Sequence, residues 1–265
     1  MQQPFNPWDY PLTPAADLRL LSPDFETYQE ALAECLLRIG HLEGEGSKKA
    51  RLLARRLHSC AAGDDRCLSP ACPLCWGRMR LWLGEQQLLL WVSYDPLLFW
   101  TLIPAKFAVG PGQLNSISPR RLNNALRQQL SRTGISGPIV GGIDGEFDLS
   151  RGVYQPHHHL AGPADIKPEM ETLGSQYYPQ TPGVYRPTYS SEVRNRPDLF
   201  SYCFKSYWPE RPRWQTNKGD KRRGRPQRLH KTRHVEWLLW RAQFSLTDFV
   251  FLAGVRRRGG RLVFT

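Results

Sequence analysis

Cysteines are the first residues of this chain whose type and spacing suggest chemistry. Four of the six fall within 16 residues, the last two in a Cys-Pro-Leu-Cys run: Cys60, Cys67, Cys72 and Cys75. Four thiolates with no spare coordination position are typical of a structural, tetrahedral zinc site. Such a metal would fold a segment that has too few apolar residues to fold alone. Ordinary reduced cysteines and disulfides are the alternatives, and Cys35 and Cys203 are expected to be free thiols.

A second group of possible ligands lies in the run Gln-Pro-His-His-His-Leu at 155–160. In a strand, residues two apart share a face, so His157 and His159 can bind one metal ion while His158 faces away. The preceding strand carries Asp144 and Glu146, again two apart. If the two strands pair, a carboxylate completes a site with two histidines and one acid that admits Mn²⁺ or Mg²⁺. An exposed polar cluster is the alternative for three histidines taken alone.

A third pattern is Tyr-Cys-Phe-Lys at 202–205, in a segment expected to be helical. Spacings of four and three place Asp198, Tyr202 and Lys205 in one row on a helix face. A free tyrosine has a pKa near 10, about three units above neutrality, and a neighbouring ammonium or metal would favour the phenolate that attacks phosphorus. The alternative is a half-buried tyrosine beside a surface lysine.

Local sequence patterns predict the elements that must position these residues. We expect helices at 22–39, 48–57, 74–91, 118–133, 197–208 and around 237–240. We expect strands at 98–103, 139–147, 153–161, 184–193 and 249–255. The strands at 139–147 and 153–161 are joined by a turn. If they pair, the carboxylates lie beside the histidines.

The order of these parts resembles that of the HUH endonucleases. A cysteine cluster is followed by a Phe-Trp-Thr-Leu strand, then by Pro-His-His-His-Leu, then by Tyr-x-x-Lys. Within that superfamily the chain is most similar to the replication initiators of small rolling-circle plasmids, over about 60–208. The resemblance implies an α+β fold: a central antiparallel sheet with flanking helices (the HUH, ferredoxin-like core), plus a small zinc-binding module.

The resemblance also implies a role for each matching residue. His157 and His159 are the divalent-metal ligands, Asp144 the acidic third ligand and Glu146 the reserve candidate. Tyr202 is the nucleophile, Lys205 its helper, and Asp198 a second acid that activates water or the closing strand. The implied activity is site-specific nicking and rejoining of single-stranded DNA through a 5′-phosphotyrosine, to initiate rolling-circle replication. The chain departs from the family in His158, where an apolar residue is usual, and in having Asp rather than Glu at 144.

Other functions are compatible with the same motifs. A single-strand tyrosine transposase and a mobilisation relaxase use the same chemistry, although relaxases usually carry three histidines after an N-terminal tyrosine. A DNA-binding regulator that keeps the fold and no longer cuts is a different class. An RNA-binding zinc protein is another, and it would bind without a second, divalent metal.

Charge is concentrated at one end of the chain. Residues 211–265 contain 15 Lys or Arg and three Asp or Glu, whereas 1–210 are neutral overall. A basic segment on a neutral body indicates a polyanionic partner, here single-stranded or hairpin DNA, with host replication proteins as further partners. A solvated basic surface is the alternative. The expected DNA-binding residues are Lys218, Lys221, Arg222, Arg223, Arg225, Arg228, Lys231 and Arg233.

Composition and local sequence patterns suggest how the 265 residues are organised into domains. Forty per cent are hydrophobic and 23% charged, which excludes wholesale disorder. We expect an N-terminal arm and helices at 1–58, the zinc module and a helix at 59–92, the nuclease core at 93–210 and a basic C-terminal segment at 211–265. The start lacks the charged and apolar runs of a secretory signal, and the most apolar stretch, 88–105, is interrupted and short for a bilayer span. A cytoplasmic protein without membrane contact is therefore expected.

Overall fold

A long β-hairpin is the centre of the fold. β2 (Ile139–Asp148) and β3 (Val153–Pro163) pair antiparallel over most of their length. The turn between them is fixed by the Asp148 carboxylate, which accepts hydrogen bonds from the backbone N–H groups of Ser150 and Arg151, and by Gly152 with φ of 65°. This hairpin confirms the expected pairing of the two chemistry-bearing strands. The computed structural model describes residues 5–12, 22, 24–215 and 221–265.

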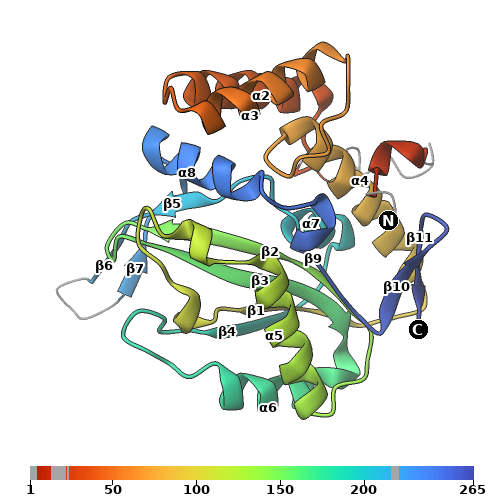
Figure 1. The fold of residues 1–265 in the computed structure, drawn as a ribbon. Helices are drawn as coiled ribbons and strands as arrows, with labels where there is room; N and C mark the ends of the chain where they lie inside the picture. Colours follow the sequence, from red (N-terminus) through yellow and green to blue (C-terminus); the bar gives the residue numbers. More distant parts are fainter. Residues whose placement is uncertain (1–4, 13–21, 23, 216–220) are drawn as a thin grey trace.

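The hairpin lies within a seven-stranded sheet of order β4-β1-β3-β2-β5-β8, with β9 also on β2 (Figure 1). The other strands are β1 (Leu97–Leu102), β4 (Thr188–Glu192), β5 (Pro209–Arg211), β8 (Gln227–Arg228) and β9 (Val250–Ala253). Two small ribbons complete the described strands: β6 (Arg213–Gln215) with β7 (Lys221–Arg223), and β10 (Val255–Arg258) with β11 (Arg261–Phe264). β5 runs parallel to β2. The sheet is therefore mixed, and the expectation of a purely antiparallel sheet is wrong at this position.

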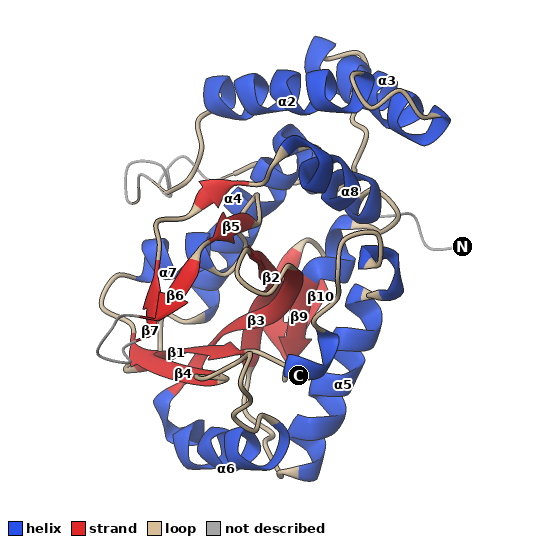
Figure 2. Cartoon of the chain, turned by 90° about the vertical axis from the view of Figure 1, so that its left-hand side faces the viewer, coloured by secondary structure: helices blue, strands red, loops and turns tan. Residues whose placement is uncertain are grey.

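Helices cover both faces of the sheet, which explains why β2 is buried along its whole length. The helices are α2 (Tyr28–Glu43), α3 (Lys48–Ala62), α4 (Pro73–Leu90), α5 (Pro119–Arg132), α6 (Lys167–Tyr177), α7 (Arg196–Tyr202) and α8 (Lys231–Arg241). Short 3₁₀ turns occur at Pro7–Asp9, Ala105–Phe107, Leu114–Ser116, Ala164–Ile166 and Leu246–Phe249. α5 and α6 lie on one side of the sheet, and α8 with the α2–α3 pair on the other (Figures 1 and 2). The described part of the chain is α+β, as expected.

Alternation along the strands sends side chains into two separate cores. Leu98, Trp100 and Leu160 pack with Leu126 of α5 and Leu173 of α6. Side chains on the opposite face of the sheet pack under α4, α7 and α8 in the larger core. The sheet therefore presents one face to each helical layer.

Several expected boundaries are corrected. α2 begins at Tyr28 rather than 22, because Thr27 and Glu30 form a reciprocal capping box. α7 ends at Tyr202, six residues before the expected end at 208. α6 lies between the expected strands at 153–161 and 184–193, where the sequence patterns predict no helix.

The basic C-terminal segment is part of the folded core. β9 pairs antiparallel with β2, and α8 buries Trp237, Leu238 and Trp240. A boundary at 210 therefore cuts through the sheet, and 211–265 is not a separate tail. Within the described residues, no helix is both long and apolar enough to cross a bilayer.

Candidate metal centre and tyrosine site

Asp144, His157 and His159 meet on one face of the central hairpin. One ligand atom from each lies within 4.8 Å of the other two. Asp144 Oδ2 is 3.1 Å from His159 Nε2 and 3.6 Å from His157 Nε2, and the two Nε2 atoms are 3.2 Å apart. The register explains the arrangement, because Asp144 is directly opposite His157 across the ladder. The expected two-histidine, one-acid group is therefore present.

The other ring nitrogens fix the orientation of both histidines. His157 Nδ1 lies 3.3 Å from the backbone carbonyl of Gln155, which only accepts, so Nδ1 carries the proton and Nε2 presents a lone pair. His159 Nδ1 lies 3.0 Å from the Thr101 hydroxyl. Asp144 Oδ1 is buried and has no hydrogen-bond partner among the described residues. A cluster of lone pairs with an unsatisfied carboxylate oxygen suits a divalent cation.

The electrostatics keep Asp144 and His159 in the protonation states that metal binding requires. Burial lowers the pKa of His159 to about 3, so its ring is neutral at pH 7. Burial alone would raise the pKa of Asp144. The positive charge of the Lys205 ammonium, 3.1 Å away, makes the largest contribution that lowers it, and the pKa of Asp144 lies well below its usual range. At neutral pH the site therefore carries an ionised Asp144 and a neutral His159 imidazole.

His158 faces the opposite side of the sheet, as strand alternation predicts. Its Nε2 is 3.2 Å from Asn123 Oδ1 on α5, and its ring packs edge-on against Phe251. Burial lowers its pKa to about 3. The structure thus separates His158 from the candidate ligands.

Glu146, the reserve ligand, belongs to a different contact. Its carboxylate is 3.4 Å from Arg211 Nε, and it is not in the group of ligand atoms around His157. Asp144 is therefore the acid that the geometry favours, and Glu146 lines the same cavity nearby.

Tyr202 lies beside the candidate metal group. Its ring centroid is 4.7 Å from that of His159 and 5.6 Å from that of Phe99, and 40% of the residue is exposed. Lys205 Nζ lies 3.4 Å from the Tyr202 ring centroid and 3.1 Å from Asp144 Oδ2. Lys205 therefore connects the tyrosine with the acid, although it lies beyond the end of α7 rather than on the same helix.

Two glycines of β2 allow the chain after α7 to lie directly on the strand. A Cβ added to Gly142 would be 2.7 Å from the Cys203 carbonyl, and one added to Gly145 would be 2.6 Å from the Trp208 ring. Such separations do not occur in folded proteins without movement of the neighbour. The glycines on either side of Asp144 therefore indicate that another segment of the chain lies close to β2. The sequence patterns used above did not predict this contact.

Helices α2 and α4 hold the 201–206 segment from its other side. Trp76 Nε1 donates to the backbone carbonyls of Phe204 and Lys205, at 3.0 and 3.1 Å. Arg80 bonds to both oxygens of Ser201, and Arg38 Nη2 to the Ser206 carbonyl at 2.9 Å. Trp76 directly follows Cys75. The element that carries the cysteine cluster therefore also positions Tyr202.

The four clustered cysteines are gathered in space as well as in sequence. The sulfur atoms of Cys60 and Cys75 are 3.6 Å apart, as are those of Cys72 and Cys60, and Cys67 lies 3.8 Å from Cys75. A tetrahedron with Zn–S bonds of about 2.3 Å has edges of about 3.8 Å. All six cysteines are free thiols. The cluster has the geometry of a metal site with four thiolate ligands.

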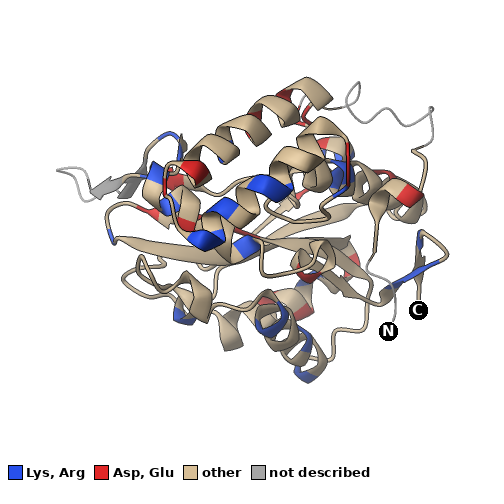
Figure 3. Ribbon diagram, turned by 45° about the horizontal axis from the view of Figure 1, so that its top comes forward, with Lys and Arg blue, Asp and Glu red and all other residues tan. Residues whose placement is uncertain are grey.

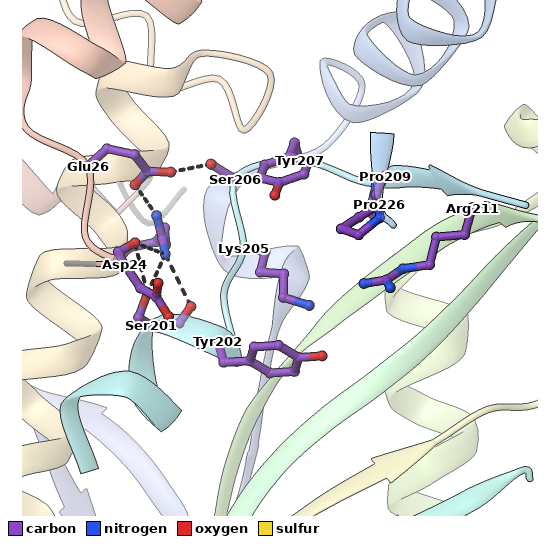
Figure 4. A pocket seen from close by; sticks show the side chains of 11 residues that line it. Asp24, Glu26, Ser201, Tyr202, Lys205, Ser206, Tyr207, Pro209, Arg211 and Pro226 are labelled. Atoms are coloured by element: carbon purple, nitrogen blue, oxygen red, sulfur yellow. Dashed lines mark hydrogen bonds and ion pairs between the residues drawn. The ribbon is translucent and has the colours of Figure 1, made fainter. Parts of the chain in front are cut away.

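Three cavities converge on Tyr202. One, of about 320 Å³, contains the Asp144–His157–His159 group. A second, of about 260 Å³, lies toward α4, with Lys205, Tyr207 and Arg211 in its wall (Figure 4). A third, of about 390 Å³, extends toward β4 and contains Asp198. Asp198 is therefore next to the tyrosine but outside the lining of the metal cavity.

The expected DNA-binding residues differ in their surroundings. Lys218 lies outside the described residues, and Lys221, Arg222 and Arg223 are on β7, of which the backbone alone is described. Arg225 and Lys231 are exposed. Arg228 pairs with Glu34 at 2.7 Å and Arg233 with Glu210 at 2.8 Å. Two of the expected charges are thus already engaged by acids.

The sequence patterns did not predict that basic residues outside the C-terminal segment form part of the positive surface. α3 carries Lys48, Lys49, Arg51, Arg55 and Arg56 and no acid in its 15 residues, and all five are exposed. Lys and Arg occur on several helices and on the C-terminal hairpin (Figure 3). The positive surface is wider than the sequence segment 211–265.

Comparisons with known proteins give no relative for this chain. It matches no family model, no curated protein and no solved structure. The functional argument therefore depends on the site itself.

Proposed function

We propose that the protein nicks and rejoins single-stranded DNA at a specific site through a covalent phosphotyrosine. The observation that carries the proposal is the placement of Tyr202 against the Asp144–His157–His159 group, with Lys205 between the tyrosine and the acid. A tyrosine exposed to solvent beside a divalent-metal site and an ammonium suits phosphoryl transfer better than it suits a structural role.

Each residue of the site would have a separate role in the reaction. Tyr202 Oη forms a bond to the scissile phosphorus and gives up its proton, while the bond to the 3′ oxygen breaks and that oxygen takes up a proton. The Lys205 ammonium stabilises the phenolate as it forms. Asp144, His157 and His159 would hold Mg²⁺ or Mn²⁺, which supplies Lewis-acid stabilisation of the phosphate oxygens. The free 3′-OH can prime synthesis or reverse the reaction, so no nucleotide cofactor is needed.

The cysteine cluster would hold a structural Zn²⁺. Its sulfur separations fit the edges of a zinc–thiolate tetrahedron, and four protein ligands leave no open position for chemistry. Since α4 continues from Cys75 to Trp76 and Arg80, this zinc would stabilise the element that holds Tyr202 in place.

The biological role that these parts support best is initiation of rolling-circle replication on single-stranded or hairpin DNA, in the manner of HUH plasmid initiators. The two strands with the ligands, the tyrosine that follows them in the chain and the cysteine cluster that precedes them favour this role over a relaxase. The basic residues of 221–233 and the exposed Lys and Arg residues of α3 would contact phosphates.

The test is incubation of the protein with single-stranded oligonucleotides and Mn²⁺, followed by a denaturing gel. We expect a protein–DNA adduct that survives SDS and disappears with Tyr202→Phe. Tyr207→Phe is the matched control, because Tyr207 is also exposed, at 47%, but lies away from the metal cavity. An intact chain that binds DNA and forms no adduct on any strand would instead be a DNA-binding regulator.

A further inference from the structure

The cavity between Tyr202 and strand β4 is separate from the metal cavity but shares a wall with it. Its volume is about 390 Å³, within the range of small-ligand pockets. Phe99, Tyr189 and Tyr202 line both cavities. A group bound here would therefore lie directly beside whatever Tyr202 attacks.

One wall of this cavity offers an aromatic surface. Tyr189 is 40% exposed on the edge strand β4, and the Arg186 guanidinium lies over its ring at 4.4 Å. Aromatic rings backed by arginine are the platforms on which proteins stack unpaired nucleobases, since every base has a π face. The apolar lining from Phe99 and Leu199 is consistent with a flat, mostly apolar ligand.

The cavity is also lined by acidic and hydrogen-bonding residues. Asp24, Glu192 and Asp198 line it together with Asn195, and Arg194 is the one basic residue among the described lining residues. Within the described residues the side chains of Asn195 and Asp198 make no hydrogen bond, and the Asn195 side chain does not cap α7. Carboxylates repel phosphate and accept hydrogen bonds from amino groups. Since three carboxylates face one guanidinium in this lining, it disfavours the DNA backbone and suits a base edge with donors.

The cavity of Figure 4, on the other side of Tyr202, is different. Arg80 there is buried and already bonded to Glu26 and Ser201, and Glu26 also accepts from Ser206. These polar groups bond to one another, so they stabilise the fold and are not available to a ligand. The β4 cavity is the better candidate for a recognition site.

We propose that the cavity between Tyr202 and β4 binds the unpaired base next to the scissile phosphate, with Tyr189 stacking on the base and Asp198 accepting from its amino group. The site would select adenine, cytosine or guanine against thymine, which has no exocyclic amino group. Asp198 is then a specificity-determining residue for the first cleavage, rather than only an acid for a later step. This inference rests on the proposed nicking function.

The experiment uses the full chain, Mn²⁺ and a pool of single-stranded oligonucleotides with a randomised central region. The covalently held and the released fragments are both sequenced, so the bases on the two sides of the broken bond are read. At one of these positions, thymine should be depleted about tenfold by the wild-type protein. Asp198→Asn keeps the shape of the side chain but adds an amide donor that can pair with O4 of thymine, so it should remove that depletion. Tyr189→Ala should lower adduct yield about tenfold.

The controls separate the possible failures. Tyr185→Ala removes another exposed tyrosine that does not line the cavity, and it should leave both base profile and yield unchanged. If Asp198 only activated water or a closing strand, Asp198→Asn would keep the wild-type base profile and change only the later step, and the inference would be wrong. If the wild-type protein formed no adduct with any member of the pool, both the nicking function and this inference would be overturned.

Discussion

The substitution His158→Ala tests whether the two faces of β3 have separate roles. His158 is 2% exposed, and its ring lies between Asn123 and Phe251 on the face away from the metal group. The Asn123 amide nitrogen already donates to the carbonyls of Asp248 and Val250. Its oxygen is therefore directed at His158, which must donate from Nε2. Removing the ring leaves that buried oxygen without its partner.

The expected cost follows from these contacts. The hydrogen bond contributes about 1 kcal/mol, and a buried acceptor left unpaired costs about 1 to 3 kcal/mol. Some packing against Phe251 is lost as well, so we expect the free energy of unfolding to fall by about 2 to 4 kcal/mol in total. Mn²⁺ affinity and the rate of adduct formation should stay within about twofold of wild type, because no contact on the metal face changes.

Urea denaturation gives the stability, and Mn²⁺ titration with adduct assays under fully folded conditions gives the chemistry. Asn123→Ala breaks the same hydrogen bond from α5 and should likewise destabilise the chain while sparing metal binding. His157→Ala should show the reverse pattern, losing Mn²⁺. Loss of Mn²⁺ binding in folded His158→Ala protein, with retention in His157→Ala, would refute the assignment of faces.

Three further predictions concern other parts of the molecule. Purified protein should contain one zinc per chain by elemental analysis, and chelation or Cys72→Ser should lower adduct yield, since the cysteine cluster anchors α4; full adduct yield from zinc-free protein would contradict this. Burial lowers the pKa of His234 to about 2, so stability should be complete above about pH 6.5 and fall by about 2 kcal/mol by pH 5, as the unfolded chain takes up the proton. His234→Gln should flatten this dependence in pH-dependent melts, and His58→Gln, at an exposed ring, should not. Replacing Lys221, Arg222, Arg223 and Arg225 by Gln should reduce the slope of log affinity for single-stranded DNA against log salt by up to about 2.8. Replacing Arg228 and Arg233, which already pair with acids, should change the slope less.

Local sequence patterns predicted the grouping of residues correctly where the alternation of side chains along a strand, or a short spacing in the chain, determines which residues lie together. Alternation placed His157 and His159 on one face and His158 on the other, and the turn at 148–152 fixed which strand faces them. The cysteine spacing was enough to place four sulfurs together. In each case the partners are close in the chain, so few conformations compete.

Contacts between distant segments were not predictable in the same way. The contact between Glu146 and Arg211, which lies on β5, is one that no local pattern indicates. The row of Asp198, Tyr202 and Lys205 assumed a continuous helix, but α7 ends at Tyr202 and Lys205 reaches Asp144 from the following turn. The pairing of β9 with β2 joins segments about a hundred residues apart, and no local pattern specifies it.

The most direct test of the account is to locate the DNA on the protein. The adduct formed with Mn²⁺ is digested with protease and nuclease, and the modified peptide is sequenced by mass spectrometry. The account predicts a single nucleotide joined through its 5′ phosphate to Tyr202. A phosphate on Tyr207 or any other side chain, or an adduct of unchanged yield from Tyr202→Phe protein, would contradict it.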